Sequence, residues 1–349
     1  MYRRSHFRIH VRPNVHSVAE TAVDEAENPR HGNHTEGVNH GKGIDRGKAV
    51  QYGYRRKGWT RMDGKVGLVI EGGGMRVLYA VGVMEQLLRH ELHFPYVVGV
   101  SAGASNSATY VSRQKGRGLR VNVDYLHDWR YMSWRSWLLR GSYVGHDFIF
   151  GEIPARLDPF DFETFHASPT RYEIGTTDCH TGEAVFFGKA DATERLEVLR
   201  ASVSLPLFCP VVHFKGHELL DGGVAMPIPL ARSIAAGNTR HVVVLSREPG
   251  YRKKPVNHLR PLLKVVYRRY PKLVEAMLTR HERYNRALEQ VERMEKEGTV
   301  MILRPQQKPR VSRLSHDPKQ LTALYELGLR DTESQLEKVK DFIERRIET

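Results

Sequence analysis

Apolar residues along this chain occur in short uninterrupted runs that alternate with stretches in which they recur at helical spacing. The runs at 66–70 and 96–100 are typical of strands buried on both faces of a parallel sheet. The first run is followed by an apolar helical face that extends to Leu88, and the second by a small-residue helix that ends near Ser112. This strand–helix–strand–helix order predicts an α/β fold with a mostly parallel sheet covered on both faces.

The pattern becomes less regular after the second helix. Residues 120–165 are rich in tryptophan and tyrosine without clean periodicity, which favours either a lid or aromatic packing in a peripheral helix pair. Hairpin turns are predicted at 180–182 and 215–216, where polar residues and glycine separate short apolar runs. The last elements predicted before a boundary near 249–255 are a helix over 230–236 and a buried strand over 241–245.

Residues 255–349 are predicted to form a mostly helical C-terminal region. Helical patterns cover about 260–297 and 318–347, and a strand-like run at 300–303 lies between them. Within the first pattern, the densely charged stretch 284–297 is predicted to be an exposed helix.

A second stretch of this region, residues 259–278, mixes aliphatic and basic side chains. A basic amphipathic helix of this kind can lie on an anionic membrane surface. The alternative is a helix whose apolar stripe packs on the sheet domain while its basic face is solvated. The prolines at Pro261 and Pro271 interrupt the pattern and favour this alternative.

Residues 1–60 differ in composition from the rest of the chain. They are rich in His, Arg, Gly and Asn and poor in aliphatic residues, which predicts a disordered basic tail. The stretch lacks the apolar core and small-residue cleavage site of a signal peptide. Its six histidines favour a solvated tail over a metal site.

Charge and cysteine content narrow the class of protein. The 349 residues carry a formal net charge of +14, yet residues 61–249 are balanced, so the basic excess lies at the two ends. Such ends suit peripheral contact with an anionic membrane, and we expect no nucleic-acid partner.

The cysteine content and the lack of long apolar runs bear on the compartment. The two cysteines, Cys179 and Cys209, lack ligand-like spacing, which argues for a reducing compartment and against a cysteine-based zinc site. No apolar run reaches the roughly 20 residues of a membrane span. We therefore expect a cytoplasmic protein that contacts the inner face of the membrane peripherally.

The stretch Gly99-Val100-Ser101-Ala102-Gly103 has the G-x-S-x-G pattern of a nucleophile elbow. In such an elbow, a tight strand-to-helix turn projects the serine hydroxyl beyond the sheet, and glycines allow the close backbone approach. We therefore expect an exposed Ser101 hydroxyl near a helix N-terminus that stabilises negative charge. The alternative is an ordinary turn in which Ser101 caps the helix.

A second glycine-rich turn, Gly72-Gly73-Gly74-Met75-Arg76, follows the first predicted strand. Its glycines leave backbone N–H groups unshielded, as a site for the oxyanion of acyl transfer requires, and Arg76 could orient the loop or add positive charge. A dinucleotide fingerprint is the competing interpretation. It is disfavoured because Val77 stands where tight helix–strand packing requires glycine.

The serine needs a base, for which the sequence offers Asp221 or a late histidine. Asp221 ends a predicted hairpin and is followed by Gly222 and Gly223 in a loop that prolines constrain. A partly desolvated carboxylate can act as the base. By contrast, His241 and His258 lie late enough for a Ser-His-Asp triad but neither sits in a comparable turn.

These three motifs, in this order, resemble those of the patatin-like phospholipase family. The resemblance covers about residues 65–247, includes the segment from Ala201-Ser202 to Pro210, and extends to the C-terminal helical part of bacterial members. It departs from the family pattern at Glu71, where aspartate is frequent, and at Val77, where glycine is frequent. It implies a three-layer α/β/α sandwich as the catalytic domain, with Ser101 as nucleophile, Asp221 as base, residues 72–76 as oxyanion loop, and no histidine, metal or cofactor.

The resemblance implies a serine acyl hydrolase that acts on lipid esters, such as glycerophospholipid or lysophospholipid. Two alternatives use the same dyad, namely a short-chain carboxylesterase and an acyltransferase. A third is a non-catalytic regulator that binds membrane or nucleic acid, which the basic ends favour and the intact motifs disfavour. The motifs specify neither head group and acyl length nor oligomeric state.

Overall fold

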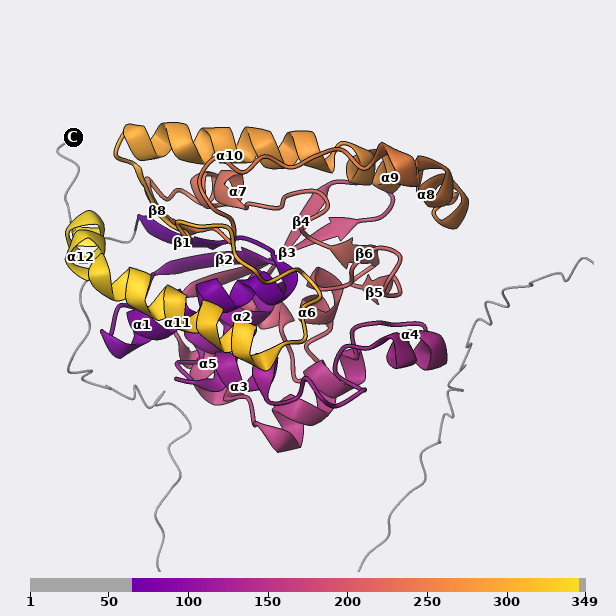
Figure 1. Cartoon of the computed structure of the whole chain (residues 1–349), viewed down its shortest axis with the longest axis horizontal. Helices are drawn as coiled ribbons and strands as arrows, with labels where there is room; N and C mark the ends of the chain where they lie inside the picture. Colours follow the sequence, from indigo (N-terminus) through magenta and orange to yellow (C-terminus); the bar gives the residue numbers. More distant parts are fainter. Residues whose placement is uncertain (1–64, 345–349) are drawn as a thin grey trace, which may run out of the picture. The chain divides into compact units, whose positions relative to one another are not determined.

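The computed structural model describes residues 65–344, whose strands form one eight-stranded sheet (Figure 1). The strand order is β5-β6-β3-β2-β1-β7-β8, and β4 pairs with β3 outside this path. The strands are β1 (Val66–Ile70), β2 (Tyr96–Val100), β3 (Arg171–Asp178), β4 (Ala184–Gly188), β5 (Val212–Phe214), β6 (His217–Asp221), β7 (Arg240–Val244) and β8 (Val300–Leu303).

The sheet is mostly parallel, as predicted. Strands β3, β2, β1, β7 and β8 run in parallel, whereas β4, β5 and β6 form the two antiparallel hairpin connections. Every residue of β1 and β2 is buried, which explains why their sequences are continuous rather than alternating.

Helices cover both faces of the sheet. From β1, Leu68 and Ile70 join an apolar cluster with residues of α1 (Leu78–Arg89), α2 (Ala102–Val111) and α11 (Pro318–Ser334). Val69 points to the opposite face and joins a cluster with Leu288 and Val291 of α10 (Arg280–Lys296). Figure 1 shows α10 and α7 (Leu230–Ala235) on one side of the strands and α1, α2 and α11 on the other. The fold is the predicted three-layer α/β/α sandwich with C-terminal helices.

Shorter helices fill the connections. They are η1 (Gly74–Val77), α3 (Arg117–Val123), α4 (Trp134–Arg140), the π-helix η2 (Phe148–Leu157), α5 (Phe162–Ala167), η3 (Lys189–Asp191), α6 (Glu197–Ser202), η4 (Asn257–Leu259), α8 (Arg260–Val266), α9 (Pro271–Leu278) and α12 (Leu336–Glu344). None of the helices described between residues 65 and 344 combines the length and apolarity that a membrane span requires.

The C-terminal helices and β8 are built into the sandwich. Strand β8 pairs in parallel with β7, and α11 crosses α1 where Gly82 and Gly328 allow the two backbones to touch. A Cβ atom at Gly82 would overlap the carbonyl oxygen of Tyr325, and one at Gly328 would overlap that of Tyr79. All described residues lie in one compact unit. The division into a catalytic domain at 65–247 and a region at 255–349 stays a prediction.

Two predictions for the C-terminal region differ from the structure. The helical pattern at 260–297 comprises the three helices α8, α9 and α10, because the chain turns at 267–270 and Pro271 begins a new helix. The predicted exposed helix at 284–297 is partly buried, since Tyr284, Leu288 and Val291 of α10 pack against apolar residues of the sheet. The predicted tail at 1–60, with its six histidines, lies outside the described residues.

Candidate active site

Strand β3 brings Ser101 and Asp221 together. Val100, the last residue of β2, pairs with Gly175, and the next β3 residue, Thr176, pairs with Asp221 at the end of β6. Both β3 residues also pair with β4, so β4 occupies the other edge. Strands β2 and β6 therefore end against each other on one edge of β3. Ser101 directly follows β2 and so lies beside Asp221.

Ser101 has the backbone conformation of a tight turn and directs its hydroxyl at the carboxylate. Its φ of 55° and ψ of −137° are rarely adopted by a residue with a side chain. The Oγ donates to Asp221 Oδ2 over 2.6 Å, and the side chain forms no capping hydrogen bond with α2. The backbone N–H of Ser101 donates to Ser202 Oγ over 2.8 Å, which holds the turn. Ser101 thus occupies the N-cap position of α2, but its side chain binds Asp221 and does not cap the helix.

Ser101 lies deeper than its motif predicts. Only 7% of the residue is exposed, so the expectation of an exposed hydroxyl is wrong. The glycine loop lies directly against it, since a Cβ atom at Gly72 would be 2.9 Å from the Cβ of Ser101. At the elbow glycine Gly103 a Cβ would be 2.5 Å from the carbonyl oxygen of Glu71, and at Gly99 one would be 2.7 Å from the nitrogen of Ala104. Glycine at these positions allows the loop and the elbow to pack together.

Asp221 is buried, and several groups stabilise its carboxylate. Oδ2 accepts the Ser101 hydroxyl and Oδ1 accepts the backbone N–H of Gly223 over 2.7 Å. Gly222 packs on the carbonyl of Gly175 with no room for a side chain. Burial raises the pKa of Asp221 above its usual range, while the Ser101 hydrogen bond and the positive charge of Arg280 oppose that rise. The carboxylate thus has the two properties of a base, access to the hydroxyl proton and an increased affinity for it.

The four N–H groups of the glycine loop from Gly72 to Met75 differ in their hydrogen bonding. The N–H of Gly72 donates to Pro227 O at 3.4 Å, and that of Met75 donates to Arg313 O at 3.1 Å. The N–H groups of Gly73 and Gly74 have no hydrogen-bond partner among residues 65–344. The predicted loop is therefore present, but the Met75 N–H is engaged by the segment around Arg313.

Arg76 lies beneath this loop. It is buried, with Glu71 and Arg247 among the charges near it, and burial lowers its pKa to about 10. Glu71, in turn, accepts the backbone N–H of Ser246 over 2.6 Å and so ties the end of β1 to the end of β7. Of the two roles predicted for Arg76, these surroundings favour orienting the loop.

No histidine in the described part of the chain hydrogen-bonds to Ser101 or Asp221. His241 is buried and bonded to Ser233 Oγ at 2.9 Å, and burial lowers its pKa to about 4. His217 pairs with Asp178 at 2.8 Å, and His146 lies 3.5 Å from Ser204 Oγ. Residues 65–344 also contain no group of three or more His, Cys, Asp or Glu side chains placed to hold a metal ion.

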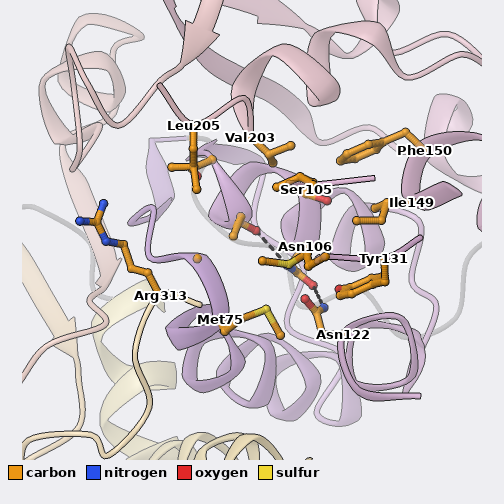
Figure 2. A pocket seen from close by; sticks show the side chains of 15 residues that line it. Met75, Ser105, Asn106, Asn122, Tyr131, Ile149, Phe150, Val203, Leu205 and Arg313 are labelled. Atoms are coloured by element: carbon orange, nitrogen blue, oxygen red, sulfur yellow. Dashed lines mark hydrogen bonds between the residues drawn. The ribbon is translucent and has the colours of Figure 1, made fainter. Parts of the chain in front are cut away.

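Two cavities meet at the Ser101–Asp221 pair. One, of about 70 Å³, has Ser101 in its wall, with apolar side chains that include Met75, Ile149 and Phe150 (Figure 2). The other, of about 750 Å³, has Asp221 in its wall and extends towards α8 and α10. Leu205 and Arg313 line both cavities. The pair can thus contact a molecule with parts on both sides.

Two protein-family models match most of the residues that form the sandwich. The model of the family described as "Patatin-like phospholipase" matches residues 68–232, which contain the elbow, the glycine loop and Asp221. Residues 68–232 are a patatin-like phospholipase domain. A second model, described as "Domain of unknown function (DUF6363)", matches residues 270–344.

Two relatives are similar to about half of this chain at low identity. The uncharacterized protein YjjU of Escherichia coli K12 is 26% identical over 187 residues, 52% of each chain. Lysophospholipase NTE1 of Eremothecium gossypii is 26% identical over 183 residues, 49% of this chain and 11% of that protein. The chain thus spans about half the length of the first of these relatives and about a tenth of the second.

Two solved structures show a weak likeness to this chain. VipD of Legionella pneumophila gives a TM-score of 0.40 at 12% identity, covering 79% of this chain and 67% of its own. The type III effector ExoU gives a TM-score of 0.35 at 13% identity, covering 78% and 53%.

The structure places three further residues near the patatin-like site that the motifs did not reveal. Lys253 precedes α8, Arg280 begins α10 and Arg313 follows β8, and all three line the larger cavity. Each is far from the motifs in sequence. Lys253 and Arg313 lie outside the predicted helices and strands, and the helical pattern that contains Arg280 gave no sign of a role at the site. The basic excess after residue 249 was the one available signal, and it gave no position.

Proposed function

We propose that this protein is a serine acyl hydrolase of ester lipids that acts through a Ser101–Asp221 dyad. The observation that carries the proposal is the 2.6 Å hydrogen bond from Ser101 Oγ to Asp221 Oδ2, in a buried position between two largely apolar cavities. A serine activated by an adjacent base is the arrangement that nucleophilic acyl transfer requires.

The dyad supports a two-step reaction. Ser101 Oγ attacks the ester carbonyl carbon while its proton passes to Asp221 Oδ2. The tetrahedral oxyanion accepts hydrogen bonds from the free N–H groups of Gly73 and Gly74. Protonated Asp221 then gives its proton to the leaving alcohol, and an acyl-Ser101 ester remains. In the second step Asp221 takes a proton from water, which attacks the acyl ester. Asp221 then returns this proton to Ser101 Oγ as the bond to Oγ breaks and the fatty acid is released.

The cavity walls favour a lipid ester over a polar one. The smaller cavity beside Ser101 is narrow, and side chains such as Met75, Ile149 and Phe150 are suited to an acyl chain (Figure 2). The family matched by residues 68–232 and the lysophospholipase name of the NTE1 relatives support the same substrate class. We infer a cytoplasmic location from the sequence alone.

Two helices beside the larger cavity support contact with a membrane surface. In α4, Leu138 is 75% exposed, and in α8, Val265 is 73% exposed. Trp137 of α4 donates to the carbonyl of Leu207, whose own N–H donates to Tyr267 just after α8. The two helices therefore flank the segment at 205–208 that lines the cavity (Figure 1). We infer that these exposed apolar side chains enter the interface when the enzyme takes up a lipid.

The nucleophile is tested with Ser101→Ala. We expect release of fatty acid from lysophosphatidylcholine and from p-nitrophenyl butyrate to fall by about 10³-fold or more, because the attacking oxygen is lost. Ser334→Ala, an exposed serine of α11, is the matched control and should keep its activity. Labelling of wild type, but not Ser101→Ala, by a fluorophosphonate separates an enzyme from a non-catalytic regulator. Full turnover by folded Ser101→Ala would exclude this mechanism.

The base is tested by comparing Asp221→Asn with histidine variants. Asp221→Asn should lose nearly as much activity as Ser101→Ala, and the double variant little more, because the pair acts as a unit. Alanine at His146, His213, His217, His241 or His258 should leave substantial turnover in folded protein. A folded histidine variant as inactive as Ser101→Ala would identify a triad instead. Hydrolysis of the short ester but not the lipid would indicate a carboxylesterase, and acyl transfer to added glycerol an acyltransferase.

A further inference from the structure

The larger cavity beside Asp221 has walls of two kinds. Apolar side chains such as Leu207, Val224 and Leu263 form one part. The other part is cationic and is formed by Lys253, Arg280 and Arg313. A wall of this composition is suited to a ligand that carries both hydrocarbon and negative charge.

These three cations have no carboxylate partner. Among residues 65–344, none of them forms an ion pair, whereas the neighbouring Arg252 pairs with Glu292 at 2.7 Å. Lys253 is half-buried, and its ammonium lies 4.8 Å from the centre of the Tyr284 ring. Burial together with the nearby charges of Arg280 and Arg313 lowers the pKa of Lys253 to about 7. Lys253 and Arg280 are half-buried and Arg313 is exposed. Unpaired cations on a cavity wall, two of them partly desolvated, favour binding of an anion.

Arg280 is held in place and directed at the catalytic carboxylate. Its Nε donates to the carbonyl oxygen of Gly223, two residues after Asp221. A Cβ atom built at Gly223 would be 2.9 Å from Asp221 Oδ1 and 3.2 Å from Arg280 Nη2. The guanidinium therefore lies within about 6 Å of the carboxylate, close enough to influence its ionisation. A ligand on Arg280 would accordingly sit next to the reacting ester.

Positive charge exceeds negative charge around this position. The carboxylates that face the cluster are Asp221 and Glu71, and Glu71 is already committed to the Ser246 N–H. Opposite them stand Lys253, Arg280, Arg313 and Arg76. An anion supplied by the substrate would correct this imbalance.

We propose that Lys253, Arg280 and Arg313 bind the phosphate of the lipid substrate, so that the enzyme selects glycerophospholipids over uncharged acylglycerols. This inference rests on the proposed function and names its substrate class. The phosphate and the acyl ester of such a lipid are carried by one glycerol unit, which matches a cation cluster beside the dyad. Arg280 lies in the segment of unknown function at 270–344, which thereby contributes to substrate recognition.

The proposal is tested with two short-chain lipids of equal acyl length, dihexanoylphosphatidate and dihexanoylglycerol, both used as monomers in solution. Lys253→Gln and Arg280→Gln should each lower kcat/KM for the phosphatidate by about 10- to 100-fold, because each removes a charge-assisted contact. The loss should appear in KM. Hydrolysis of dihexanoylglycerol should change little in Lys253→Gln. Arg280→Gln also removes a charge that acts on Asp221, so it should affect both lipids, with the larger loss on the phosphatidate. Arg286→Gln, which removes the same charge from an exposed site on α10, is the matched control.

Binding is measured separately on Ser101→Ala by calorimetric titration with inorganic phosphate and with an ether analogue of lysophosphatidate. We expect the ether lipid to bind at least tenfold more tightly than inorganic phosphate, because it also contacts the apolar wall, and both to weaken in the Lys253→Gln background. Equal affinities would mean that the site takes free phosphate instead, and would overturn the proposed lipid selectivity.

Loss of activity on both lipids to the same extent in both variants would overturn the proposal, because it would show that these cations only support the Asp221 loop. If wild type hydrolyses neither lipid but Ser101→Ala still binds the ether lipid through Lys253, the proposed function fails and the phosphate site stands. No binding of either probe, with normal hydrolysis of dihexanoylglycerol, would leave the proposed function and exclude the site.

Discussion

The carboxylate of Asp221 is buried, so solvent cannot stabilise its negative charge. Its carboxylate accepts the hydroxyl of Ser101 and the N–H of Gly223, and Arg280 is the nearest strong positive charge that opposes the effect of burial. Because burial still raises the pKa of Asp221, the folded protein binds this proton more tightly than the unfolded chain does. The property that suits this carboxylate to the proposed role of base therefore costs stability at neutral pH.

We expect Asp221→Asn to increase the free energy of unfolding at about pH 8 by about 1 kcal/mol, a gain typical when a strained active-site group is replaced. A raised folded-state pKa contributes stability below the unfolded value, and this stability is lost as pH rises through the folded value. The advantage of asparagine should therefore shrink as pH falls and Asp221 takes up its proton. Urea unfolding across this pH range measures it.

Asp147→Asn, at an exposed carboxylate paired with Arg200, is the control and should show no such pH-dependent difference. If Asp221→Asn were less stable than wild type at every pH, the hydrogen bonds to the carboxylate would outweigh the cost of burying its charge.

At the scale of helices and strands, the sequence predicted best those elements whose structure depends on neighbouring residues in the chain. The bounds of β1, β2 and β8 agree with the predicted runs because a strand buried on both faces has no polar positions. The elbow and the glycine loop could be located because their close backbone contacts require glycine. In contrast, Lys253, Arg280 and Arg313 lie before α8, at the start of α10 and between β8 and α11. They reach the site only through the packing of these segments, which nothing local in the sequence encodes.

Helix α8 shows how one element can fit two interpretations. Leu263 is buried against the neighbouring helix and Val265 is exposed, so the helix both packs on the sandwich and presents an apolar side chain to solvent. Lys264 and the adjoining Arg268 and Arg269 are exposed as well. Neither of the two alternatives drawn from the sequence describes it alone.

We expect Lys264→Gln, Arg268→Gln and Arg269→Gln together to weaken binding to vesicles of phosphatidylglycerol by about 100-fold, since each basic contact contributes about 1 kcal/mol near an anionic surface. Sedimentation of vesicles at low and high salt measures the effect, and binding of the wild type should fall steeply with salt. The control removes the same charge from α10, at Arg286, Arg293 and Lys296. Equal binding of the wild type to neutral and anionic vesicles would contradict membrane attraction by α8.

The stability of the whole molecule depends on a few positions where the C-terminal region packs tightly against the patatin-like domain. The crossing of α1 and α11 is the closest of these, because Gly82 and Gly328 bring two helix backbones into contact. The residues around it, including Leu321, Leu324 and Tyr325, are buried in the same cluster as the sheet. Separation of these helices would expose that cluster to water.

We expect Gly82→Ala to destabilise the protein by about 1–3 kcal/mol, although alanine is the better helix former, because the added methyl group overlaps the Tyr325 carbonyl. Gly328→Ala should have the same effect through Tyr79. Gly151→Ala is the control, since its methyl group would lie 3.6 Å from its nearest neighbour, the end of the Arg200 side chain. Thermal unfolding monitored by circular dichroism measures all three, and a stabilised Gly82→Ala would show that the helices separate without cost.

Strand β8 has a consequence for how proteins with this architecture can diversify. It belongs to the sequence segment 270–344 by family match, yet in space it is the edge strand that covers β7. If recombination moved this segment to another patatin-like domain, the new domain would need an exposed edge that matches β7 and a glycine on the surface of α1. Such exchanges would usually fail. We therefore expect the two segments to be inherited together, and ligand preference to change by substitution within them rather than by exchange of one segment.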